Sequence, residues 1–166
     1  KLDAAQKECD KILELLPKNF SEKSVSLALQ LKAHLLTANR KLEEAVNCYS
    51  AVIESCSNPQ MALINRGHSY VCLKRLELAS KDFDAAEAFK CNPYTKAILL
   101  SNRARVHIIK GELASAVEVA EQACQSCERI PDVLATSGLA LTRTGNFELA
   151  KVKLDKAIEL DPYCAS

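Results

Sequence analysis

Residues 142–162 read TRTGNFELAKVKLDKAIELDP, and this stretch decides the fold. It contains a turn signal, Gly145-Asn146, and it ends at Pro162. Between them, apolar residues recur at spacings of three and four: Phe147, Ala150, Leu154 and Ala157. That spacing places them on one face of a helix with about 3.6 residues per turn. Because glycine permits a left-handed helix end and proline breaks a helix, the stretch predicts a turn followed by an amphipathic helix.

The same pattern occurs four times, in windows of 34 residues: 26–59, 60–93, 97–130 and 131–164. A three-residue insertion, 94–96, lies at the junction before the third window. Position 20 of every window is alanine (Ala45, Ala79, Ala116, Ala150), and position 8 is always small (Ala33, Gly67, Ala104, Gly138). Small side chains at these positions let two helices approach closely, since larger ones would overpack the contact. Each window therefore predicts two antiparallel helices joined by a turn at positions 15 and 16.

Residues 1–19 fit the second half of a further repeat, with Leu2, Ala5, Cys9 and Ile12 at its apolar positions. Residues 20–25 are extra, and we expect them to lengthen the loop or the following first helix. All four glycines fall at position 8 or 15, and all five prolines lie at or beside window junctions. These helix breakers agree with the apolar positions, which were chosen without reference to them.

The stretch at 142–162 resembles the signature of the tetratricopeptide repeat (TPR) family. The resemblance covers nearly the whole chain, although position 4 is leucine rather than the frequent tryptophan, and three windows lack the proline at position 32. It implies an all-α fold, a right-handed α-solenoid of helix–turn–helix repeats, in one array over residues 1–166. In that family the first helices line a concave surface that binds peptides or helices of partner proteins.

The groove-lining positions of the family hold two polar ladders here, one of asparagines and one of histidines with an arginine. The residues that we expect to contact a partner are His34, Asn65, His68, Asn102, Arg105, Ile109 and Arg143. Asparagine amides suit an extended peptide backbone, and Arg105 offers a planar fork to a carboxylate. With Ile64 and Ile98, this describes a groove for an apolar segment that carries acidic groups. An equal alternative is that these side chains are polar residues of a solvated helix face.

Two sequence segments, Ile64-Asn65-Arg66-Gly67 and Ser101-Asn102-Arg103-Ala104, resemble a motif of the TPR subgroup that binds the acidic C-terminal tails of Hsp70 and Hsp90. That carboxylate clamp needs further Lys and Arg side chains in the flanking repeats. With Asn102 as the central asparagine, the following repeat supplies Asp132, which would repel the tail. With Asn65 at the centre, the flanking positions hold Gln30, His34, Ile98 and Asn102, so neither choice completes the clamp. The leading hypothesis is therefore a general interaction scaffold or adaptor within a larger protein or complex. A co-chaperone role is the alternative.

The composition argues against nucleic-acid-binding and membrane-spanning proteins. The net charge is +1, from 22 Lys and Arg against 21 Asp and Glu, whereas nucleic-acid surfaces show a basic excess. No stretch is apolar enough to span a membrane. We therefore expect protein or peptide partners, with no nucleic acid and no membrane, and we expect exposed ends of the array to self-associate.

Eight cysteines fall mostly at helical spacings among apolar residues, which favours reduced thiols in the cytoplasm or nucleus. Cys124 and Cys127 form a CxxC inside a predicted second helix, where packing is the better interpretation than zinc or redox chemistry. His107 is expected in the interior or at a junction, and Asp82 on a solvated outer face. No catalytic constellation or phosphate loop is present, so we expect neither an enzyme nor a cofactor.

Overall fold

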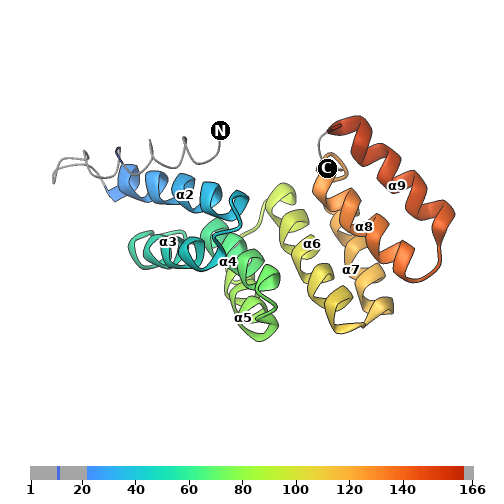
Figure 1. The fold of residues 1–166 in the computed structure, drawn as a ribbon, viewed down its shortest axis with the longest axis horizontal. Coiled ribbons are helices and arrows are strands. Elements are labelled where there is room, and N and C mark those ends of the chain that lie inside the picture. Colours follow the sequence, from blue (N-terminus) through green and yellow to red (C-terminus); the bar gives the residue numbers. More distant parts are fainter. Residues whose placement is uncertain (1–10, 12–21, 163–166) are drawn as a thin grey trace. The chain divides into compact units, whose positions relative to one another are not determined.

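The computed structural model describes residue 11 and residues 22–162 (Figure 1). Residues 22–162 form eight helices and no strand: α2 (Glu22–Ala38), α3 (Leu42–Ser55), α4 (Gln60–Cys72), α5 (Leu76–Glu87), α6 (Pro93–Lys110), α7 (Leu113–Ser126), α8 (Pro131–Arg143) and α9 (Phe147–Leu160). The predicted all-α fold of helical hairpins is confirmed. The half repeat expected over 1–19 lies outside the described residues, apart from Lys11.

The helices divide into two compact units. The first contains the hairpins α2–α3 and α4–α5, and the second contains α6–α7 and α8–α9. Within each unit, the first helix of the second hairpin packs on the second helix of the first hairpin, α4 on α3 and α8 on α7. None of the helices in residues 22–162 combines the length and apolar character that crossing a membrane requires.

Every hairpin turns through a residue in the left-handed region at position 15. Gly111 and Gly145 have φ of 79° and 82°, and Arg40 and Lys74 have φ of 62° and 58°. In each turn the next backbone N–H bonds back to a carbonyl five residues earlier, as from Asn146 to Leu141 at 2.9 Å. This is the Schellman helix ending, which satisfies carbonyls that the helix leaves unpaired. Two of the four turns therefore adopt the strained conformation without glycine.

The core of each hairpin depends on the small residues at positions 8 and 20. The four position-20 alanines are 0–3% exposed (Ala45, Ala79, Ala116, Ala150). A Cβ atom added to Gly67 would lie 2.4 Å from Phe83 Cε1, and one added to Gly138 would lie 2.7 Å from Leu154 Cγ. The facing helix thus occupies the space that a side chain would need.

The two extra segments both lengthen first helices. Residues 94–96, expected as an insertion at a junction, belong to the first turn of α6, which reaches 18 residues. Asn92 caps this helix by accepting a hydrogen bond from the Thr95 backbone N–H at 2.8 Å, and Pro93 occupies the first turn. Residues 22–25 likewise extend α2 before the repeat begins at Ser26.

Candidate protein-binding surface

In the first unit, one stripe of α2 is exposed along four successive turns. It consists of Leu27, Leu31, His34 and Ala38, at positions 2, 6, 9 and 13 of the repeat. The two leucines are 68% and 51% exposed. These are the positions at which the resemblance placed groove residues, so the apolar side chains stand on the expected face of the first helix.

His34 and Asn65 lie together, as two of the predicted site residues. The Asn65 amide Nδ2 is 2.9 Å from His34 Nε2, and the imidazole packs edge-on against Tyr49 with 5.8 Å between ring centroids. Burial lowers the pKa of His34 below its ordinary value. A neutral ring can accept the hydrogen bond from the Asn65 amide, so the link between α2 and α4 suits neutral pH.

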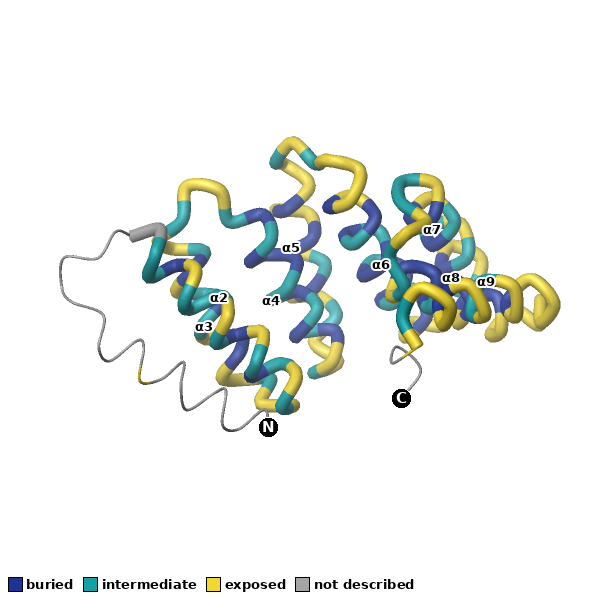
Figure 2. The backbone as a smooth tube through the Cα atoms, turned by 90° about the horizontal axis from the view of Figure 1, so that it is seen from above, coloured by how far each residue is buried: buried dark blue, intermediate teal, exposed yellow. Residues whose placement is uncertain are grey.

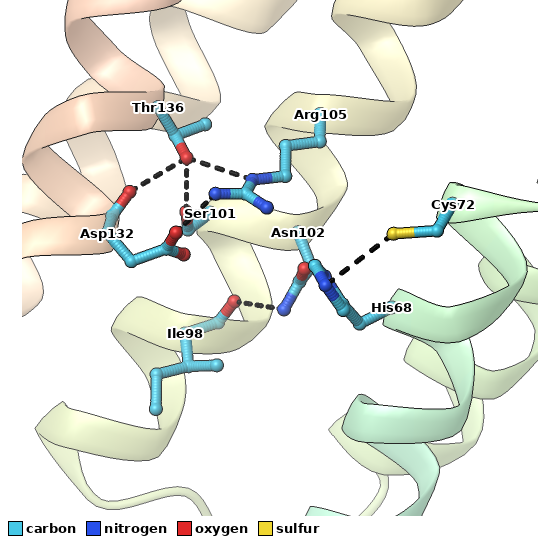
Figure 3. Close-up of polar contacts among 8 residues, drawn as sticks. All are labelled: His68, Cys72, Ile98, Ser101, Asn102, Arg105, Asp132 and Thr136. Atoms are coloured by element: carbon cyan, nitrogen blue, oxygen red, sulfur yellow. Dashed lines mark hydrogen bonds and ion pairs between the residues drawn. The ribbon is translucent and has the colours of Figure 1, made fainter. Parts of the chain in front are cut away.

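His68 and Cys72 follow on the same face of α4 (Figure 3). His68 is half-buried, Cys72 is exposed, and Cys72 Sγ lies 3.7 Å from His68 Nε2. Ile64 is 0% exposed, so the expectation that it lines a groove is wrong. It belongs to the buried apolar core of the first unit.

In the second unit, Arg105 is engaged by the chain itself (Figure 3). Its guanidinium donates to Thr136 Oγ1 at 3.0 Å and forms an ion pair with Asp132. Ser101 also donates to Thr136 Oγ1, at 3.0 Å, and Thr136 donates to the Asp132 carbonyl at 2.8 Å. Asp132 therefore occupies the position beside Arg105 where the sequence predicts a partner's carboxylate. The hydrogen bonds and the ion pair together join α6 to α8.

The remaining predicted residues of the second unit differ in accessibility. Asn102 is 4% exposed, and its amide donates to the Ile98 carbonyl at 3.1 Å within α6. Ile109 is 47% exposed, and Arg143 is exposed at the end of α8. Leu139, at position 9 of the last repeat, is 46% exposed. Ile109, Leu139 and Arg143 are thus accessible on the first helices of this unit, whereas Asn102 is not.

A cavity of about 600 Å³ lies beside the exposed stripe of α2. Its described lining comes from the first turns of α2 and from the segment between α3 and α4: Ser26, Leu27, Gln30 and residues 55–58. Leu27 belongs to both the stripe and the cavity wall. The apolar surface at this end of α2 is therefore hollowed as well as exposed.

Comparison with known proteins agrees with the repeat pattern. The family model for the tetratricopeptide repeat matches residues 26–59 and 131–164. Residues 26–59 and 131–164 are thus each similar to one tetratricopeptide repeat. No curated protein matches it.

Several solved structures have the same fold at low sequence identity. The APC/C hetero-tetramer Cut9-Hcn1 is 16% identical with a TM-score of 0.78, and the match covers 98% of this chain and 30% of that chain. BtubC from P. vanneervenii is 14% identical with a TM-score of 0.71, covering 99% and 75%. YrrB, titled a TPR protein with an unusual peptide-binding site, is 20% identical with a TM-score of 0.55, covering 99% and 80%. The chain thus spans about a third of the first of these structures.

Two polar residues of the helical hairpins, Asp82 and His107, differ from the places that the sequence predicts. Asp82 is 6% exposed and forms an ion pair with Arg66, whose Nη2 lies 2.7 Å from Asp82 Oδ1, so its expected solvated place on the outer face is wrong. The hydrogen bond to Asp82 raises the pKa of Arg66. His107 is half-exposed, and its Nδ1 lies 2.5 Å from Glu112 Oε2 at the following turn. It is therefore a junction histidine rather than an interior one.

The CxxC cysteines lie at the C-terminal end of α7, the second helix of its hairpin. Cys124 lies in α7 and is buried, and Cys127 follows directly after the helix end at Ser126. Burial raises the pKa of the Cys124 thiol, which keeps it protonated and inert. Within the described part of the chain, no three His, Cys, Asp or Glu side chains gather as a metal site would require.

Leu27 is the most exposed large apolar residue of the described first helices, and it was not predicted as a site residue, nor were Leu31 and Leu139. Leu27 occupies position 2 of the first window, a groove-lining position in TPR proteins. Most of the predicted site residues instead belong to the two polar ladders at positions 6 and 9. An apolar residue at that position, four before Leu31 and seven before His34, was the available signal.

Proposed function

We propose that this TPR chain is a scaffold or adaptor module that binds an apolar segment of a partner protein on the exposed faces of its first helices. The observation that carries the proposal is the stripe on α2, where Leu27 and Leu31 are 68% and 51% exposed. Exposed large apolar side chains in a contiguous row mark interaction surfaces, because a solvated helix face gains nothing from them.

The polar residues beside the stripe define the chemistry of the partner segment. His34 and Asn65 form a hydrogen-bonded pair next to Leu31, so a partner backbone at this place meets amide and imidazole groups. Arg143 adds an exposed cation on the second unit. A largely apolar segment therefore fits the surface of the first unit best, and an acidic group of a partner suits Arg143 on the second unit.

The co-chaperone alternative receives less support from the geometry. The asparagine needed at the centre of the carboxylate clamp, Asn102, is buried, and its amide donates to the Ile98 carbonyl. Arg105, the neighbouring cation, is paired with Asp132. A C-terminal carboxylate would have to displace both internal contacts.

The cysteines favour a reducing compartment for this function. The six described cysteines form no disulfide with one another, and Cys124 packs in the core as a small apolar side chain. We therefore assign the module to the cytoplasm or the nucleus, where thiols stay reduced. Antibody imaging of the untagged chain beside fluorescent reporters that mark each compartment would test this assignment.

The test of the binding surface compares two exposed leucines, one on a first helix and one on a second helix. Leu31 lies on a first helix, and Leu78 lies on a second helix and is 41% exposed. Affinity capture with mass spectrometry is performed with wild type, Leu31→Asp and Leu78→Asp, after both variants are shown to unfold at the wild-type temperature. The proposal predicts that Leu31→Asp loses the captured partners and Leu78→Asp keeps them.

Equal partner recovery by all three proteins would overturn the surface assignment. A synthetic acidic C-terminal tail peptide, titrated in parallel, separates the alternative function. Saturable binding of that peptide, insensitive to Leu31→Asp, would replace the apolar-segment proposal with a tail-receptor function.

A further inference from the structure

Each unit contains one interface at which a first helix packs on the preceding second helix, and both interfaces share a polar contact. In the first unit, Arg66 Nη1 donates to Ser50 Oγ at 2.9 Å. In the second unit, Ser137 Oγ donates to Glu121 Oε1 at 3.0 Å. Both contacts join position 7 of the docking helix to position 25 of the helix that receives it.

The docking helices also share a pattern of packed residues around this donor. Four residues before it and three residues after it, the side chain is small or β-branched and buried. These residues are Ala62 and Ser69 in α4, and Val133 and Ala140 in α8, each 0–2% exposed. A second helix of this protein thus recognises a helix that carries a small residue, a hydrogen-bond donor and another small residue on one face.

Helix α9 offers the same receiving surface, and that surface is open (Figure 2). Position 25 of its repeat is Asp155, which is exposed. Position 28 is Ile158, which is 44% exposed, whereas the equivalent Cys124 in α7 is 1% exposed beneath α8. Phe147, at position 17, is 65% exposed. The apolar and acidic groups of a helix-receiving face are therefore present without a covering helix among the described residues.

We propose that this face of α9 binds an amphipathic helix of a partner protein that presents an arginine or lysine to Asp155, flanked by small residues. The site is continuous with the repeating interface of the protein and distinct from the first-helix surface of the proposed function. A basic residue suits it better than the serine of α8, because Asp155 is a carboxylate and charge-assisted hydrogen bonds are the stronger ones. The bulk of Ile158 requires small side chains opposite, as Ala62 provides against α3.

A peptide with the sequence of residues 59–73, with Cys72→Ser, is the probe, because it carries this pattern with Arg66 as the basic residue. Its binding to the full chain is measured by fluorescence anisotropy. We expect saturable binding that weakens about tenfold in Ile158→Glu, which places a charge in the apolar contact. Asp155→Lys is expected to weaken binding several-fold, and an Arg66→Glu version of the peptide is expected to restore it.

The control variant is Leu149→Glu, because Leu149 lies on another side of α9 and is 59% exposed. It should bind the peptide as wild type does. Absence of binding at about 1 mM peptide, the range of the weakest specific contacts, would overturn the proposal. So would equal losses in Leu149→Glu and Ile158→Glu, or no rescue by the charge-reversed peptide. A concentration-dependent dimer in sedimentation that Ile158→Glu abolishes would assign the face to a second copy instead.

Discussion

Substitution of Gly67 by alanine should destabilise the protein, although alanine is the better helix former. Inside a helix the exchange gains about 1 kcal/mol from conformational propensity. The added Cβ would lie 2.4 Å from Phe83 Cε1, and the Phe83 ring is 0% exposed, so the ring has no space to move away. Overpacking of this kind costs about 1–3 kcal/mol. Because the clash is close and the ring is enclosed, we expect the overpacking cost to exceed the propensity gain, with a net loss of up to about 2 kcal/mol in the free energy of unfolding.

The assay is urea denaturation followed by circular dichroism, with the double variant as its internal control. Phe83→Leu removes the ring that Gly67→Ala strikes, so the two substitutions together should destabilise less than the sum of their separate effects, by about 1 kcal/mol. Additive effects, or a Gly67→Ala variant more stable than wild type, would refute the claim that α4 and α5 approach each other as closely as described.

Three further predictions concern a turn, a histidine and a buried ion pair. Lys74→Gly should raise the free energy of unfolding by about 1 kcal/mol, because glycine adopts the left-handed φ of 58° without strain. Urea denaturation measures this change, and a variant less stable than wild type would contradict the turn geometry. Burial lowers the folded-state pKa of His34, so stability should fall as pH drops from about 6.5 through that lower pKa; a His34→Gln variant should lose this pH dependence, and an NMR titration that places the pKa above 6.5 would contradict it. Asp82→Asn should cost about 2–4 kcal/mol in thermal unfolding because it leaves the Arg66 charge half-buried, and an unchanged melting temperature would contradict the ion pair.

The hairpins could be predicted from the sequence because their packing depends on local, repeated features. An alanine at position 20 opposite a small residue at position 8, and a turn at position 15, recur at a fixed period. Arg40 and Lys74 adopt the same left-handed φ as Gly111 and Gly145, so the repeated turn overrides the preference of the individual residue.

The polar contacts were harder to predict because each depends on a second residue in another helix. The pattern of α5 predicts a solvated Asp82, yet Arg66, sixteen residues earlier, faces it across the hairpin. The sequence predicts that Asp132 repels an acidic tail, but in the structure Asp132 pairs with Arg105 of the preceding first helix. Charge complementarity between position 9 of one first helix and position 2 of the next was the signal that could have indicated this second contact.

Photo-crosslinking tests the central claim, the recognition of a partner segment by the first-helix face, most directly. A photoreactive phenylalanine replaces Leu31 in one protein and Leu78 in another, and the cross-linked peptides of captured partners are sequenced. The account predicts that position 31 labels one apolar segment of a partner and that position 78 does not label it. Labelling of that segment from position 78 and not from position 31 would contradict it.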